Sequence, residues 1–315
     1  MQRDSRQLRL LLTTAIGPAL WGTTYYVTTE WLPDGRPLLV GALRALPAGL
    51  LLLALAPRLP VGDWWWKTAV LGVTNIGAFF ALLFVAAYEL PGGVAGTLGA
   101  VQPLIVATLS ALVLMERVRP RVFVAGLSAV VGVGLLVLRG EAALSPLGVL
   151  AGLGATLSMS IGVVLTKRWG RPAGVSLLTF TGWMLTAGGG ALVLPTLLLE
   201  GLPSTVTWSQ TAGFAYMALV NTALAYGLWV RGLQLLPASR VTYLTLLPPL
   251  VATLVGVALA GERLTGWQGA GFIITVASFA LAQTTWSPSW SRSRAAREAR
   301  RRGMATPSAP VASHH

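Results

Sequence analysis

Cysteine is absent from the sequence, and the two histidines, His314 and His315, are its last two residues. The first absence excludes disulfides, iron–sulfur clusters and thiolate chemistry. The second excludes a histidine-based metal site or catalytic triad in the core, so we expect no metal and no cofactor. Charge is also scarce, since charged residues form 10% of the chain against about 25% in a soluble domain. With 54% hydrophobic residues, most of this chain cannot face water.

Ten apolar stretches are long enough to cross a bilayer, which takes about 20 residues, or about 17 at the short end. Their approximate bounds are 10–29, 38–56, 67–87, 94–114, 122–138, 147–166, 175–197, 211–230, 241–260 and 267–285. Arginines precede the first stretch, as in a signal peptide, but it is too long for one, and we expect an uncleaved span. Residues 287–315 are rich in Ser, Arg and Pro, which predicts a disordered basic tail. The sequence thus predicts an all-α integral membrane protein with ten transmembrane helices.

Basic residues divide unevenly between the two sides that ten alternating spans create. Cytoplasmic loops are enriched in Lys and Arg, and with the N-terminus inside, most basic residues fall on the cytoplasmic side. That set is Arg3, Arg6, Arg9, Arg58, Lys67, Arg117, Arg119, Arg121, Lys167, Arg168, Arg171, Arg231, Arg240 and the arginines of the tail. The outer set is Arg36, Arg139 and Arg263. This split predicts that both termini are cytoplasmic, and it explains the net charge of +13 without a nucleic-acid partner.

One stretch of the chain occurs twice. Residues 90–138 align without a gap to residues 236–284, at an offset of 146. The matched pairs are Leu90-Pro91 with Leu236-Pro237, Pro103 with Pro249, Glu116-Arg117 with Glu262-Arg263 and, upstream, Asn75 with Asn221. Twofold repeats are a common ground plan of transporters. Because five spans per repeat is an odd number, the second repeat enters the membrane from the opposite side, and we predict two inverted five-helix repeats, residues 1–143 and 144–286. Alternating access then arises when the two halves exchange their conformations.

Short motifs also recur in a fixed order along the spans. They are Leu20-Trp21-Gly22-Thr23 in the first span, Arg44 in the second, Pro103…Glu116 and Pro249…Glu262 closing the fourth and ninth, and residues 222–233 in the eighth. Together they resemble the EamA type of the drug/metabolite transporter superfamily over about residues 10–285. The sixth span departs, since Met159 stands where the family often has Trp. The resemblance implies a small-molecule carrier and leaves the cargo open, because members export amino acids, metabolites, pigments or drugs.

Arg44 is the basic residue that falls inside a predicted span. A charge there costs roughly 2.5–3.5 kcal/mol on insertion scales, so it needs a partner or a water-filled cavity. One interpretation is that Arg44 binds a substrate carboxylate or holds a gate. The other, favoured by its position in the outer third of the span, is a structural ion pair with Glu30.

Asn75 and Asn221 are predicted at equivalent depths in the third and eighth spans. Buried amides need hydrogen-bond partners. These two asparagines either contact a substrate in a central cavity or hydrogen-bond one span to another.

Five aromatic residues, Trp21, Tyr25, Trp183, Tyr226 and Tyr243, are candidates to line an apolar cavity with polar tips. Such a lining suits an aromatic or amphipathic cargo. Trp and Tyr are also enriched at membrane interfaces, which is the competing explanation.

Pro103 and Pro249 lie inside predicted spans at equivalent points of the repeat. Proline removes a helical hydrogen bond, and in lipid the freed carbonyl must be satisfied by a neighbour or by water. We predict paired hinges, with static kinks as the alternative. The acidic residues lie at or beyond span ends, so no proton relay is evident, and facilitated export or exchange fits as well as proton antiport.

These features predict a bacterial inner-membrane carrier that exports a small molecule. An amino acid or a similar amphipathic compound is the first candidate cargo, and efflux of drugs, pigments or nucleobase-type compounds is the alternative. A membrane-embedded enzyme is disfavoured, because the spans hold no His, no Cys and no midplane carboxylate. A non-transporting scaffold is disfavoured by polar residues of the kind that line cavities.

Overall fold

The computed structural model describes residues 2–115, 120–138, 145–236, 244–245 and 247–284, which form helices joined by short connections and contain no strand. In chain order the elements are α1 (Gln2–Gly22), α2 (Thr24–Trp31), α3 (Pro37–Leu55), α4 (Trp64–Gly72), η1 (Val73–Gly77), α5 (Ala78–Glu89), α6 (Gly92–Leu98), η2 (Gly99–Val101), α7 (Gln102–Leu114), α8 (Pro120–Leu138), α9 (Pro146–Trp169), α10 (Leu177–Pro195), η3 (Thr196–Glu200), α11 (Trp208–Ala215), η4 (Tyr216–Leu224), α12 (Ala225–Leu235), α14 (Leu247–Leu259) and α15 (Gly266–Thr284). Three of the short elements, η1, η3 and η4, are π-helical, and η2 is a 3₁₀ turn.

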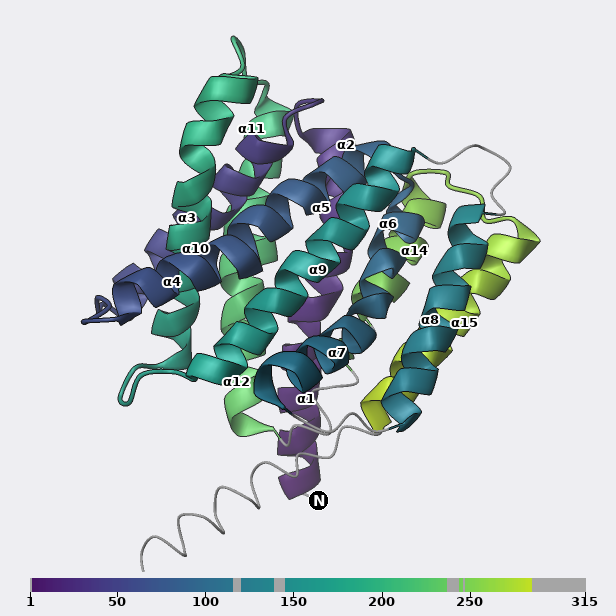
Figure 1. The fold of residues 1–315 in the computed structure, drawn as a ribbon. Coiled ribbons are helices and arrows are strands. Elements are labelled where there is room, and N and C mark those ends of the chain that lie inside the picture. Colours follow the sequence, from purple (N-terminus) through teal and green to yellow (C-terminus); the bar gives the residue numbers. More distant parts are fainter. Residues whose placement is uncertain (1, 116–119, 139–144, 237–243, 246, 285–315) are drawn as a thin grey trace, which may run out of the picture.

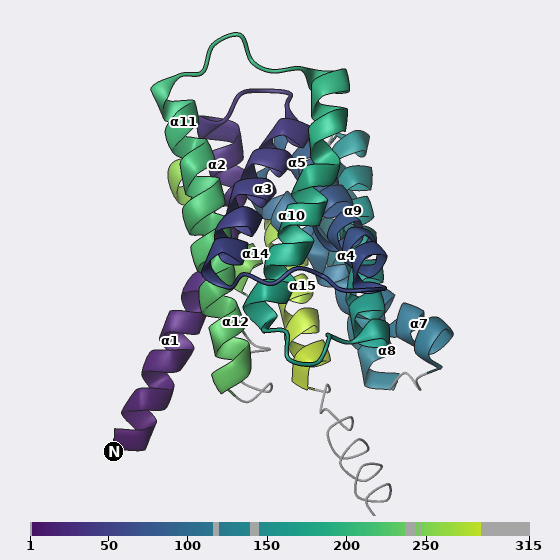
Figure 2. The same ribbon diagram turned by 90° about the vertical axis from the view of Figure 1, so that its left-hand side faces the viewer.

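Six helices of the described chain are long and apolar enough to cross a membrane. They are Pro37–Leu55, Trp64–Glu89, Gly92–Leu114, Pro146–Trp169, Leu177–Glu200 and Trp208–Leu235, with shorter apolar helices at Gly126–Leu135 and Leu247–Leu259. Each of the six coincides with a stretch predicted from the sequence. The all-helical, multi-pass prediction is therefore confirmed, with most helices running side by side along one direction (Figures 1 and 2).

The first predicted span differs from the structure at both of its ends and in its middle. Helix α1 begins at Gln2, well before residue 10, and the helical path is interrupted at Thr23. The hydroxyl of Thr23 donates a hydrogen bond of 2.8 Å to the carbonyl of Leu20. Such a local side-chain bond competes with the helical pattern, which explains why α1 ends at Gly22.

The closest helix packing joins segments far apart in the sequence. Helix α3 packs on α10, α8 on α15, α5 on α9, and α1 on α12. Each of these pairs joins a helix before residue 143 to one after residue 144. Phe80 and Phe84 of α5, Leu185 of α10 and Met217 of η4 share one buried core cluster. The two predicted halves are therefore interleaved, and side chains from both of them meet in the interior.

Candidate functional site

Arg44, on α3, is 3% exposed, and its guanidinium is held by uncharged groups. Its Nε donates to Thr222 Oγ1 at 3.0 Å, and one terminal nitrogen donates to Thr24 Oγ1 at 3.3 Å. The ring of Phe80 lies 4.4 Å from the guanidinium carbon. Within the described residues no carboxylate lies within 4.0 Å of Arg44, so the ion pair with Glu30 is not formed. The cation–π contact with Phe80 offsets about 2 kcal/mol of the cost of burying this charge. It does not replace a counter-ion, and none lies beside Arg44 among the described residues.

The hydroxyls that hold Arg44 belong to a network that links three segments. Thr24, at the start of α2, also donates to Asn221 Oδ1 at 3.3 Å. The amide nitrogen of Asn221 donates back to the carbonyl of Leu20 at the end of α1. Arg44, Thr24, Asn221 and Thr222 are all buried. A displacement of η4 relative to α1–α2 would therefore alter the partners of the Arg44 charge.

Both predicted asparagines lie in π-helical segments, Asn75 in η1 and Asn221 in η4. Asn75 donates to the carbonyl of Leu71 at 3.0 Å and packs closely against Gly162 of α9. Asn221 instead reaches α1, so each asparagine contacts a helix of the other predicted half. The structure thus places both at contacts between helices, and Asn221 also in the Arg44 network. π-Helical turns within α-helices often mark functional sites.

Trp21 and Tyr226 are brought together, with ring centroids 5.1 Å apart, and Trp229 adds a third ring 5.7 Å from Trp21. The indole N–H of Trp21 is buried and has no hydrogen-bond acceptor among the described residues. Tyr25 directly follows Thr24 on α2, and Tyr226 lies one turn after Thr222, so both tyrosines are next to the residues that hold Arg44. The predicted aromatic lining is therefore clustered around α1, α2 and α12, beside the Arg44 network.

Two predicted aromatic residues are not part of this cluster. Trp183 of α10 packs with Leu71, Val175 and Phe180, and its indole N–H donates to the carbonyl of Arg58 at 2.6 Å. The indole N–H of Trp183 is thus hydrogen-bonded at the basic end of the molecule and does not face Arg44. Tyr243 lies outside the described residues.

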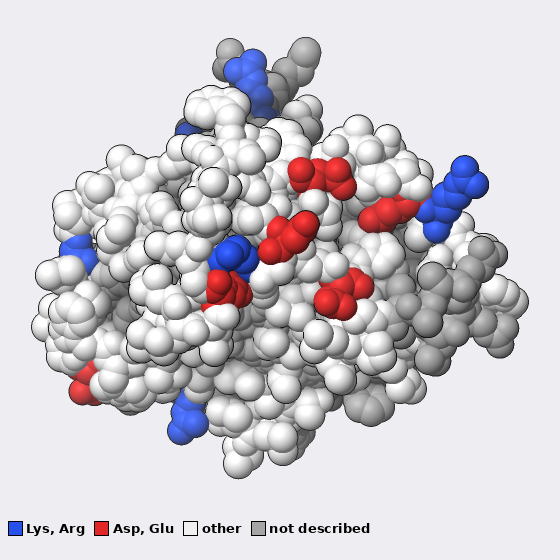
Figure 3. Space-filling view, turned by 90° about the horizontal axis from the view of Figure 1, so that it is seen from above, with Lys and Arg blue, Asp and Glu red and all other residues white. Residues whose placement is uncertain are grey.

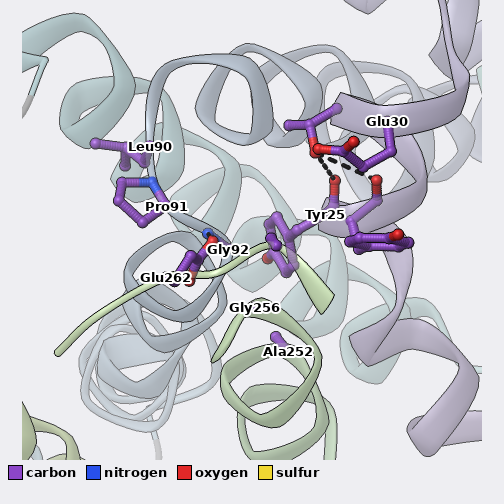
Figure 4. A pocket seen from close by; sticks show the side chains of 11 residues that line it. Tyr25, Glu30, Leu90, Pro91, Gly92, Ala252, Gly256 and Glu262 are labelled. Atoms are coloured by element: carbon purple, nitrogen blue, oxygen red, sulfur yellow. Dashed lines mark hydrogen bonds between the residues drawn. The ribbon is translucent and has the colours of Figure 1, made fainter. Parts of the chain in front are cut away.

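A cleft of about 260 Å³ opens between α2, the start of α6 and α14. Tyr25, Glu30 and Glu262 are among its lining residues, with Glu262 beside Gly92 (Figure 4). The carboxylate of Glu262 accepts hydrogen bonds from the backbone N–H groups of Gly92, at 2.6 Å, and Gly93, at 3.3 Å. It therefore caps the first turn of α6, whose N–H groups have no partner within the helix.

A second carboxylate caps a helix at the same end of the molecule. Glu200, the last residue of η3, accepts from the N–H groups of Leu38 at 2.7 Å and Leu39 at 2.8 Å, at the start of α3. Arg36 donates to the carbonyls of Glu200 and Gly201. Two carboxylates from after residue 144 thus hold the first turns of two helices from before residue 143.

Charged residues separate by sign between the two ends of the molecule. The upper end of Figure 1, seen from above in Figure 3, gathers acidic side chains. Those at the connections and helix ends of this side are Glu30, Asp34, Glu89, Glu200 and Glu262, with Arg36 and Arg263 among them. The opposite end carries Arg9, Arg58, Lys67, Lys167, Arg168, Arg171 and Arg231, with Asp63 in an ion pair to Lys67. An end-to-end electric field therefore runs along the helix direction.

The two predicted hinge prolines lie at helix starts. Pro103 occupies the first turn of α7, directly after the 3₁₀ turn η2, and Pro249 occupies the first turn of α14. The first turn needs no N–H donor from proline, so the missing hydrogen bond costs little there. The helical path of residues 92–114 is irregular at this point, which keeps the hinge hypothesis open.

Sequence reasoning missed Thr24 and Thr222, which hold Arg44, and Phe80, which covers it. The sequence offered one indication: each threonine is next to a residue that was singled out, since Thr24 follows the Trp21-Gly22-Thr23 motif and Thr222 follows Asn221. Hydroxyl residues are common in membrane helices, where they bond to their own backbone, so this signal does not distinguish them from the other threonines.

Comparison with known families gives one match that spans almost the whole chain. The model of the EamA-like transporter family matches twice, over residues 9–138 and again over residues 146–284. The chain belongs to the EamA-like transporter family. It is a multi-pass membrane protein of the drug/metabolite transporter type, as the motifs predicted, and its family members are transporters rather than enzymes. The two matches fall one within each of the two predicted repeats, residues 1–143 and 144–286.

Several relatives resemble this EamA-like chain along most of its length. It is 44% identical to Protein PecM of Dickeya dadantii over 84% of this chain and 89% of that protein. It is 30% identical to a probable amino-acid metabolite efflux pump of Salmonella typhimurium, over 88% of this chain and 94% of that protein. A solved crystal structure shares the fold with a TM-score of 0.61 at 23% identity, covering 87% of this chain and 97% of the other.

Proposed function

We propose that this EamA-like chain exports a small metabolite across the bacterial inner membrane by alternating access, with the Arg44 network as the cargo site. The observation that carries the proposal is the buried guanidinium of Arg44, which has no carboxylate partner among the described residues. A buried charge persists where it has a functional partner. Cargo with a carboxylate would supply that partner transiently, so binding would change the balance between states.

An amino acid or a similar amphipathic compound is our first candidate for the cargo. Arg44 offers donors for a carboxylate, and the rings of Trp21, Tyr226 and Trp229 offer an apolar surface beside it. The name of the Salmonella relative, a probable amino-acid metabolite efflux pump, supports this choice. Efflux of drugs, pigments or nucleobase-type compounds is the alternative, and the same aromatic cluster favours it, because flat apolar molecules stack on such rings.

The proposal includes ten spans in two inverted halves, with both termini in the cytoplasm. Its support is the double match of the family model and the reciprocal contacts of the asparagines. Asn75 contacts α9 while Asn221 contacts α1, which are the first spans of the opposite halves. The basic end of the molecule would face the cytoplasm. A membrane enzyme or a scaffold is disfavoured by the family, whose members transport.

Flux measurements on the purified protein test this proposal. We expect proteoliposomes with the wild-type chain to accumulate labelled amino acids or their derivatives faster than empty liposomes, and Arg44→Ala to abolish the difference. Thermal unfolding of Arg44→Ala separates the two roles of the residue, because a cargo contact predicts an intact fold. Full activity of Arg44→Ala would contradict a cargo role for this residue.

A further inference from the structure

Away from the ends of the predicted spans, the sequence places one basic residue, Arg44, and no acidic residue. Arg44 lies about two turns inside α3. The acidic residues of the whole sequence are Asp4, Glu30, Asp34, Asp63, Glu89, Glu116, Glu141, Glu200, Glu262 and Glu298. Those within the described residues lie near or beyond the ends of helical segments, and the sequence places the others outside the predicted spans. The interior is therefore electropositive, whichever way the carrier faces.

We propose that, among amino acids and similar amphipathic compounds, the preferred cargo is a net anion, a small organic acid whose amino group is absent or blocked, and that zwitterionic amino acids are carried less well. An N-acylated amino acid is one member of this class. The inference rests on the proposed function, in which Arg44 holds the cargo, and it narrows the class of compound that this site accepts.

The first argument is an excess of hydrogen-bond donors at the site. A guanidinium has five N–H donors, and the structure assigns Arg44 two hydrogen bonds, both to threonine hydroxyls. The buried indole N–H of Trp21 has no acceptor within the described part of the chain. A carboxylate offers two acceptor oxygens and pairs with a guanidinium in a forked geometry. The site is thus short of the acceptors that an organic acid supplies.

The second argument concerns the ammonium group of an unmodified amino acid. Such a group needs an acidic partner in a low-dielectric interior, and no described carboxylate lies within 4.0 Å of Arg44. The face of Phe80, which is suited to a cation, is already covered by Arg44 itself. An ammonium group placed nearby would also be repelled by the guanidinium. Blocking or removing the amino group relieves both penalties.

The third argument is the field along the molecule. Positive-inside topology accounts for the basic end. At the other end (Figure 3), Glu200 and Glu262 cap helix starts, whereas Glu30, Asp34 and Glu89 add negative charge that topology does not require. An anion is drawn toward the basic end and repelled from the acidic end. With the basic end facing the cytoplasm, this arrangement favours capture of an anion inside and its release outside.

Phenylalanine and three derivatives test the inference, and they form two pairs matched in size, one with and one without the N-acetyl group. N-acetylphenylalanine is an anion, phenylalanine a zwitterion, phenylalanine amide a cation and N-acetylphenylalanine amide neutral at pH 7. Binding to the full-length protein in detergent is measured by thermal unfolding, since a ligand of the folded state raises its midpoint. Flux of each compound is measured in proteoliposomes. We expect the anion to bind at least tenfold more tightly than phenylalanine and to show at least tenfold greater flux, accelerated by a lumen-positive potential.

Variants at the site separate charge from shape. Arg44→Gln should remove the preference for the anion, Arg44→Lys should retain it, and Thr222→Val, which removes one hydroxyl partner and keeps the charge, should also retain it. Phenylalanine binding as tightly as its N-acetyl derivative in the wild type would overturn the inference, even if Arg44→Gln does not fold. Flux of phenylalanine without a preference for the anion would support the proposed function and contradict the inference about anionic cargo. Preferred binding of the anion without flux of any compound would support the inference and contradict the transport proposal.

Discussion

Glu262 and Gly92 are joined by a hydrogen bond of 2.6 Å, from the backbone N–H of Gly92 to the Glu262 carboxylate. The residues are 170 positions apart in the sequence, and the bond connects the α14–α15 connection to the start of α6. A carboxylate at a helix N-terminus is also stabilised by the helix dipole. Gly256 makes this approach possible, because a Cβ atom there would collide with the carboxylate. The contact therefore joins the two predicted halves where they border the cleft.

Replacing this carboxylate by an amide should weaken the interface. Glu262→Gln keeps the size of the side chain but loses the charge and one of the two acceptor oxygens. We expect a loss of about 1–2 kcal/mol in the free energy of unfolding, seen as a lower unfolding temperature in detergent. The matched control is Glu30→Gln, an exposed carboxylate that lines the same cleft, where we expect no change. Equal unfolding temperatures for both variants would show that the cap does not stabilise the fold.

Helix positions were largely predictable from the sequence, because long apolar runs can cross a bilayer only as helices or closed barrels. The placement of Arg44, Asn75 and Asn221 inside helical segments followed from the same runs. Three features did not. The partner of Arg44 was expected to be Glu30 on proximity along the chain, but the helices bring Thr222, from residues far away, to the guanidinium instead.

The remaining two features are local geometry that composition does not encode. The π-helical turns around Asn75 and Asn221 add a residue to a helical turn without any marker such as proline. Trp183 matched the aromatic pattern of a cavity, yet its indole N–H reaches the carbonyl of Arg58. A tryptophan in a membrane helix satisfies its N–H wherever an acceptor lies, and the acceptor's position depends on tertiary packing.

The contact between Asn75 and Gly162 gives a prediction about helix packing. A methyl group at position 162 would collide with the amide of Asn75, so Gly162→Ala should separate η1 from α9. We expect a destabilisation of about 1–3 kcal/mol, as for other overpacked interiors. The control is Gly190→Ala, in α10, where a Cβ atom has open space and alanine should raise helix stability by up to about 1 kcal/mol. Thermal unfolding of both variants in one detergent decides the point, and a Gly162→Ala protein as stable as the wild type would contradict it.

The orientation of the chain is tested by labelling single cysteines, since the native sequence contains none. Ser204 lies in the exposed connection before α11, and Ala173 lies in the exposed connection between α9 and α10. With the basic end in the cytoplasm, Ser204→Cys should react with an impermeant maleimide added to intact cells. Ala173→Cys should react with the same maleimide only after the cells are lysed. The opposite pattern would reverse the orientation, and with it the direction of the proposed transport.

The paired prolines give a prediction about the alternating mechanism. Pro103 lies after the 3₁₀ turn η2 inside the helical path of residues 92–114, and Pro249 lies in α14. Alanine would supply the N–H donor that proline lacks and permit a straighter continuous helix. If the two halves are inverted, the prolines serve opposite gates, so the two substitutions should bias the carrier toward opposite facing states. A bias of about 1 kcal/mol changes the ratio of two states roughly fivefold.

A cysteine at Thr29, which lines the cleft at the acidic end, reports through its labelling rate the fraction of molecules open to that side. Pro103→Ala and Pro249→Ala should change that rate in opposite directions, while Pro57→Ala, outside the helices, should leave it unaltered. Unchanged labelling with normal transport in both variants would show that the prolines are static kinks.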